Sequence, residues 1–158
     1  MAASGYRILD EPRPGPLSHL IVNPFWPLLS LMLGGAWIAW PWFALNAVAL
    51  GSASLRRELL LIAGAMSTAA LTVFATLWIA RAIGAADAVS PYARIALFVG
   101  KVSFAYALHL RQSSGLALYE YFGGRARNAI GVVITAALGR SYVLDRLATD
   151  DYLWGIFS

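Results

Sequence analysis

The chain has 158 residues, of which 59% are hydrophobic and 13% are charged, about half the roughly 25% found in soluble domains. Its mean hydropathy is +0.66. So few charges cannot solvate a globule of this length, while the apolar residues exceed what one small core buries. The composition therefore excludes a disordered tail, a basic nucleic-acid binder and a typical soluble enzyme. It indicates an all-α, polytopic integral membrane protein.

The basic residues are almost all arginines: eleven of the twelve are Arg, and the net charge is +4. They lie singly or in pairs at the edges of apolar runs, as anchors on anionic lipid do, and not in a stripe interleaved with aromatics. We therefore expect a lipid bilayer and no nucleic acid as partner. The chain has no cysteine, and its two histidines, His19 and His109, are far apart. We expect no metal and no cofactor.

Hydropathy divides the chain into a polar, extended N-terminal segment (1–19), a membrane domain (20–144) and an interfacial C-terminal tail (145–158). The membrane domain is predicted to hold three to four embedded helical segments with interfacial helices beside them. These segments lie at about 20–51, 59–80, 92–110 and 129–144.

The first segment, 20–51, is uncharged but is interrupted by three prolines and by Gly34–Gly35. It fits either one kinked span or a helical hairpin, broken at Trp40–Pro41, that enters and leaves on the same side. With four simple spans, the arginines divide six inside to five outside. A same-side hairpin changes this division to seven against four, so the positive-inside rule favours the hairpin.

The second segment, 59–80, is an uncharged run of 22 residues and predicts a transmembrane helix. Small or weakly polar side chains recur on it every four residues, and such a stripe is typical of a helix-packing seam. Its members are Gly64, Thr68, Thr72 and Thr76.

The third segment is expected to begin after a polar connection at 84–91 and to run from Tyr92 to about Leu110. The helical pattern continues to Gly123–Gly124, and the part after Arg111 is expected to lie along the membrane surface or to project from it. The fourth apolar run, 129–139, is too short to span unless the helix continues past Arg140.

Lys101 lies near the middle of the third segment and is the main candidate site residue, because ionisable groups inside a membrane are usually functional. In helical projection it shares a face with His109 and Gln112, with Glu120 nearby. This face is predicted to bind an anionic headgroup, a quinone or a partner's carboxylate. The alternative is that Lys101 reaches along a tilted helix to the headgroups.

No catalytic motif is visible, and no carboxylate lies between Glu58 and Asp87 or between Asp87 and Glu120, which disfavours a proton-driven transporter. We expect a non-enzymatic accessory or scaffold subunit of a larger assembly, bound to a membrane protein or to a second copy of the chain. The alternative is a small oligomeric channel or transporter that uses Lys101 and the threonine stripe. An enzyme acting on lipid through His109 and Glu120 ranks third. The preference for Arg over Lys suggests a bacterial cytoplasmic membrane.

Overall fold

The computed structural model describes residues 15–84 and 86–147, and every regular element in these ranges is a helix. The all-α prediction is therefore confirmed for this part of the chain. The elements are η1 (Pro16–Leu20), α1 (Phe25–Leu33), α2 (Ala36–Ala49), α3 (Leu55–Ile83), α4 (Ala86–Tyr121) and α5 (Ile130–Leu147). The predicted interfacial tail lies mostly outside the described residues.

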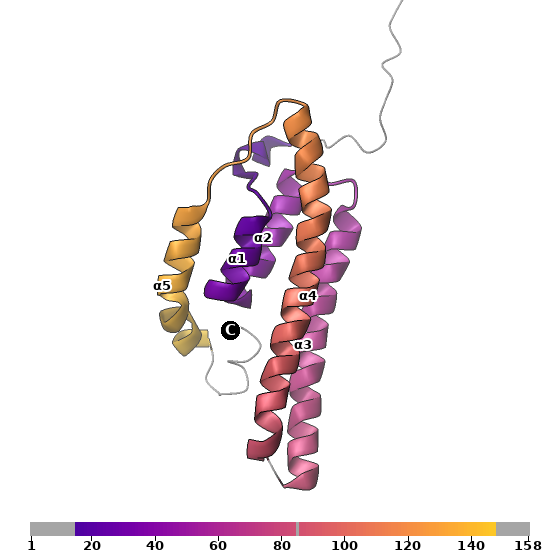
Figure 1. Cartoon of the computed structure of the whole chain (residues 1–158), viewed down its shortest axis with the longest axis vertical. Helices are drawn as coiled ribbons and strands as arrows, with labels where there is room; N and C mark the ends of the chain where they lie inside the picture. The colour runs from indigo at the N-terminus through magenta and orange to yellow at the C-terminus, as the bar shows by residue number, and fades with distance from the viewer. Residues whose placement is uncertain (1–14, 85, 148–158) are drawn as a thin grey trace, which may run out of the picture.

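Helices α3 and α4 form a long antiparallel hairpin that runs the length of the molecule (Figure 1). At 1.5 Å per residue they extend about 44 and 54 Å. Both are long and apolar enough to cross a membrane, over Leu55–Ile83 and Val89–Tyr121. The predicted polar connection at 84–91 is wrong in extent, because α4 already begins at Ala86 and contains Pro91. Helix α4 also continues without a break past Arg111, so its last turns project beyond the bundle.

Helices α1 and α2 form a short antiparallel hairpin whose two open ends lie at the same end of the molecule as the beginning of α3 (Figure 1). The turn is at Gly34–Gly35, so the predicted break at Trp40–Pro41 is wrong and Pro41 lies inside α2. Gly35 has φ 101° and ψ 175°, a conformation that essentially only glycine adopts. A Cβ at Gly34 would lie 2.9 Å from the Cβ of Ala136, so α5 passes directly against this turn.

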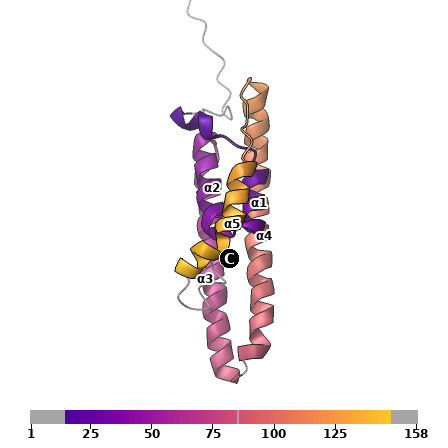
Figure 2. The ribbon, with the colours of Figure 1, turned by 90° about the vertical axis from the view of Figure 1, so that its left-hand side faces the viewer.

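Helix α5 packs against α1, as the view turned by 90° also shows (Figure 2). It continues past Arg140 to Leu147, beyond the predicted end at 144, but it ends well short of the α3–α4 turn (Figure 1). The chain between α4 and α5 crosses the connection between η1 and α1, where the Arg127 backbone N–H donates to the Ile21 carbonyl at 2.9 Å.

The two ends of the molecule therefore differ in the helices that they contain. At one end, η1, α1, α2 and α5 lie on one side of the long hairpin, whereas toward the other end the described residues of α3 and α4 extend beyond them (Figures 1 and 2). The long hairpin carries exposed large apolar side chains in this part, among them Leu71, Phe74, Trp78, Tyr92, Ile95 and Phe98.

Gly35→Ala is expected to destabilise the fold by about 1–3 kcal/mol, because alanine is strained at the positive φ of the turn. The free energy of unfolding, followed by helical circular dichroism in a denaturant titration, measures the effect. Gly131→Ala is the matched control, since a Cβ there meets nothing within 4 Å. Equal stability of the two variants would contradict the turn at Gly34–Gly35.

Candidate functional site

Three polar side chains are buried together where α2, α3 and α4 meet. Asn46 lies near the end of α2, Glu58 in the first turn of α3 and Gln112 in α4, with exposed fractions of 1%, 0% and 1%. Burying such groups is unfavourable unless their hydrogen bonds are replaced inside the protein. Their contacts therefore decide whether the cluster is a structural element or an open site.

Gln112 is the centre of this cluster and uses both ends of its amide. Its Nε2 donates to the Phe43 carbonyl and to Glu58 Oε2, each at 2.9 Å. Its Oε1 accepts a hydrogen bond of 2.9 Å from Asn46 Nδ2. One side chain of α4 thus joins α2 and α3.

Glu58 accepts from three neutral donors. Its Oε2 accepts from Gln112, and its Oε1 accepts from the hydroxyls of Ser54, at 2.8 Å, and Ser52. Asn46 Oδ1 in turn accepts from the Val22 backbone N–H at 3.0 Å. The polar cluster is closed: its side chains bond one another, two serines of the α2–α3 connection and the backbone, and they join four segments of the chain.

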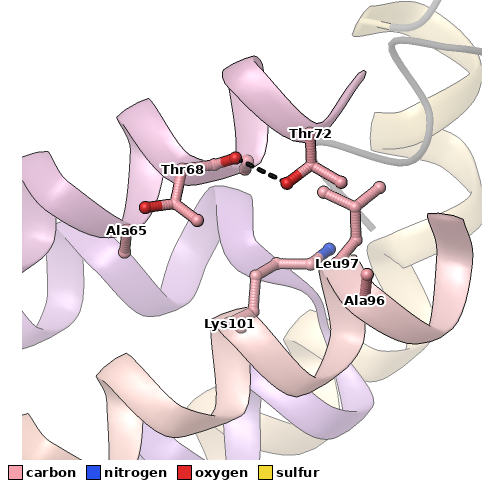
Figure 3. A pocket seen from close by; sticks show the side chains of 8 residues that line it. Ala65, Thr68, Thr72, Ala96, Leu97 and Lys101 are labelled. Carbon is pink, nitrogen blue, oxygen red and sulfur yellow. Dashed lines mark hydrogen bonds between the residues drawn. The ribbon is translucent and has the colours of Figure 1, made fainter. Parts of the chain in front are cut away.

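Lys101 lies elsewhere, on the face of α4 that packs against α3. Its side chain is 8% exposed and runs toward Leu97 and the level of Thr72 on the facing helix (Figure 3). Thr68 and Thr72 lie near the middle of the uncharged run 59–80. Lys101 is thus buried between α3 and α4 at mid-height.

A cavity of about 10 Å³ lies beside Lys101, with room for about one water molecule. It lies between α3 and α4 and is lined by Ala65, Thr68, Ala69, Thr72, Ala96, Leu97, Gly100 and Lys101 (Figure 3). The positive charge of Arg140, on α5, acts on Lys101. Lys101 is therefore the charged group in the wall of the cavity, and Arg140 acts on it from outside the lining.

The structure does not bring the four predicted binding residues together. Gln112 follows Lys101 by eleven residues in α4, about 16 Å along the axis, and belongs to the polar cluster. His109 is partly buried and stacks on Tyr106 with ring centroids 6.1 Å apart, and its Nδ1 has no hydrogen-bond partner among the described residues. Glu120 is exposed near the end of α4.

The small-residue stripe of α3 faces α4 of the same chain. A Cβ at Gly64 would lie 3.3 Å from the ring of Phe104, and Thr68 and Thr72 line the Lys101 cavity. The hydroxyls of Thr72 and Thr76 donate to the carbonyls of Thr68 and Thr72, at 2.8 and 2.7 Å. These two hydroxyls therefore bond within α3, and the first three members of the stripe lie at the seam between α3 and α4.

Sequence reasoning missed Glu58 and Asn46. Glu58 follows Arg56–Arg57 and has the pattern of a charged flank outside a span, and Asn46 lies in an uncharged apolar run. The available signal was an amide within that run, since an amide in apolar surroundings needs polar partners.

An apolar groove of about 230 Å³ lies between α2 and α3. Its lining residues are Ala36, Trp37, Trp40, Pro41, Ala44, Ile62, Met66 and Ala69. Ala69 also lines the Lys101 cavity, so the groove and the cavity share a wall.

No protein-family model matches the chain, and neither a curated protein nor a solved structure shows significant similarity to it. Within residues 15–84 and 86–147, no three His, Asp or Glu side chains are grouped so that they could hold a metal ion.

Gln112→Leu is expected to lower the free energy of unfolding by about 3 kcal/mol or more. The change removes a hydrogen-bond partner from Glu58, from Asn46 and from the Phe43 carbonyl. Each buried polar group that is left unsatisfied costs about 1–3 kcal/mol. Denaturant titration followed by circular dichroism measures the loss.

The control is Arg111→Leu, which places the same residue at the exposed neighbouring position and is expected to change stability by at most about 0.5 kcal/mol. A Gln112→Leu protein as stable as this control would show that the polar cluster does not hold the helices together.

Proposed function

We propose that the chain is a small integral membrane protein of the bacterial cytoplasmic membrane and serves as a non-enzymatic accessory or scaffold subunit of a larger membrane assembly. One observation carries this proposal. Of the most apolar stretches of α3 and α4, only 17% and 22% is buried within the chain. A core helix of a soluble protein would be mostly buried, whereas lipid or a partner helix can cover an exposed apolar surface.

In this proposal α3 and α4 are the two spans, and the α1–α2 hairpin and α5 enter from one side without crossing. A turn at membrane depth is tolerated where protein covers its backbone. Gly34 and Gly35 are buried, and their N–H groups both donate to the Ser30 carbonyl, at 2.7 and 2.9 Å. The covered turn supports a re-entrant hairpin.

The arginines support a cytoplasmic location for the end of the molecule where α3 begins. Near that end lie Arg56, Arg57, Arg111, Arg125 and Arg127, and near the α3–α4 turn lie Arg81 and Arg94. Positive charge collects on the cytoplasmic side of membrane proteins.

The non-enzymatic role is supported by the use of the buried polar groups. Glu58, Gln112 and Asn46 direct their hydrogen bonds to other helices and to the backbone, so they serve the fold. The surface left for interaction is the apolar, partly aromatic exterior of α3 and α4. Such a surface suits packing against another membrane protein.

The alternative, a channel or transporter, has less support. The cavity beside Lys101 holds about one water molecule, and Thr72 and Thr76 bond within their own helix. A conducting path would have to form between copies of the chain.

Cysteine labelling tests the membrane arrangement on a chain that has no cysteine of its own. In intact cells, the exposed position of Ala53→Cys is expected to react only with membrane-permeant maleimide, and Ala82→Cys also with an impermeant one. Leu71→Cys, in the lipid-facing part of α3, is expected to react only after detergent is added. Labelling of Ala53→Cys by the impermeant reagent would contradict the cytoplasmic location of the end where α3 begins.

Co-purification tests the subunit role. The tagged full chain, extracted in mild detergent, is expected to elute with a stoichiometric membrane protein, identified by mass spectrometry. Replacing exposed apolar residues of the long hairpin, as in Phe74→Ala with Phe98→Ala, is expected to reduce recovery of the partner without changing insertion. A chain that elutes as a solitary monomer under all mild conditions would remove this function.

A further inference from the structure

Lys101 and Arg140 bring two positive charges together from different helices. Lys101 belongs to α4 and is 8% exposed, and the charge of Arg140, on α5, acts on it. Both residues take part in interactions within the chain. Hydroxyls and carbonyls can satisfy the donors of such groups, but among the groups of a protein a carboxylate is what cancels the repulsion between two cations. The acidic residues of the chain are therefore the groups to compare as neighbours of this pair.

The acidic residues of the long hairpin lie too far along the helices to reach Lys101. Asp87 and Glu120 are 14 and 19 residues away in α4, about 21 and 28 Å along its axis. Glu58 belongs to the closed polar cluster at the level of Gln112, and both of its oxygens accept hydrogen bonds there. These three carboxylates therefore do not lie at the level of Lys101.

The acidic residues that precede η1 start from the distant end of the molecule. Asp10 and Glu11 come before η1, whose Leu17 packs in one apolar cluster with Leu116. Leu116 is 15 residues beyond Lys101 in α4, about 22 Å along the axis. The remaining acidic residues of the sequence all follow Arg140, and they are Asp145, Asp150 and Asp151.

Asp150 and Asp151 follow α5 at a distance that allows them to return to Arg140. Helix α5 ends at Leu147, seven residues after Arg140, about 10 Å along its axis. The next three or four residues span at most about 10–14 Å, which covers that distance. Asp145 follows Arg140 by five residues within α5, whereas residues that face each other on a helix are three or four apart.

We propose that the segment 149–151 docks at Lys101 and Arg140, with the carboxylates of Asp150 and Asp151 as the counter-charges of the two basic side chains. This contact anchors the chain after α5 at mid-height of α4, in place of the interfacial position that hydropathy alone predicts for 145–158. The run that follows, 152–157, consists of Tyr, Leu, Trp, Gly, Ile and Phe, which suits the exposed apolar side chains of the long hairpin. The inference goes beyond the proposed subunit role and does not depend on it.

Disulfide formation tests the docking in the full chain, which has no cysteine of its own. Ala96→Cys lies at the exposed edge of the cavity, beside Leu97, toward which the Lys101 side chain runs (Figure 3). Thr149→Cys directly precedes the acidic pair, so all four charges are retained. With copper phenanthroline as oxidant, in lipid bilayers, we expect these two cysteines to form a disulfide, which mass spectrometry detects as the loss of two hydrogens. A disulfide requires Cα atoms within about 7 Å of each other.

The matched control pairs Thr149→Cys with Ala82→Cys. Ala82 is exposed on α3, ten residues nearer the α3–α4 turn than Thr72, about 15 Å along the axis. This second pair of cysteines is expected to stay reduced under the same conditions.

Charge variants show whether the acidic pair holds the segment in place. Asp150→Asn with Asp151→Asn is expected to slow formation of the first disulfide by about tenfold or more, in line with the loss of hydrogen bonds between charged groups. Arg140→Met is expected to slow it while both acids are present and to have no further effect once both are asparagine. Arg140→Lys and Asp145→Asn are the controls and are expected to leave the rate unchanged.

An Ala96→Cys, Thr149→Cys chain that stays reduced overturns the proposal. So does preferential bonding to Ala82→Cys, which would place the segment toward the membrane surface at the α3–α4 turn. A rate that the two asparagine substitutions leave unchanged also overturns it, even if Arg140→Met does not fold. These readouts need no partner protein, so they are distinct from failure of the subunit role, which is read from co-purification.

Discussion

The arrangement of this molecule depends on a carboxylate that is completely removed from solvent. Glu58 is 0% exposed and is held by three neutral donors, one of which, Gln112, also binds Asn46 and the α2 backbone. In the membrane setting that we propose, apolar contact alone gives little preference between one helix packing and another, because lipid is as apolar as the side chains. Polar bonds that have no substitute in lipid supply that preference. The cluster therefore fixes the hairpin of α1 and α2 against α3 and α4.

The closed cluster lies at the end of the molecule where α3 begins, and the glycine turn of the hairpin then reaches to about mid-height. Ala36, at the beginning of α2, lines the groove whose wall at Ala69 adjoins Lys101. The tip of the hairpin and the buried lysine are thus parts of one neighbourhood, although they are 65 residues apart in sequence. The position of the hairpin, fixed at Glu58, determines the shape of the groove between α2 and α3.

Local properties of the sequence predicted much of the fold but few of its contacts. The length of the uncharged run 59–80 predicts α3. Helical periodicity predicts that Lys101 and Gln112 share one face of α4, and both residues are buried. The sequence pattern predicts the turn of the hairpin at Trp40–Pro41. In the structure α2 accommodates Pro41, and the turn lies at Gly34–Gly35, because only glycine suits the φ of Gly35. Helical periodicity places Gln112 on the face of Lys101, but it does not predict that the partners of Gln112 come from α2 and α3. Pairings between distant segments depend on how helices pack, and the residue pattern of one helix does not contain that information.

Glu58 and Lys101 are both buried ionisable residues, but their surroundings differ. The carboxylate has donors on both oxygens, and no ligand can reach it without breaking bonds that hold the helices. Lys101 instead lines a small cavity between α3 and α4, and the charge of Arg140 acts on it. Retaining a lysine at mid-height of an apolar bundle is unfavourable, and packing alone does not require it, since an apolar side chain of similar length would fill the same space. Lys101 nevertheless takes part in an interaction within the chain, so the fold accommodates its burial as it does that of Glu58.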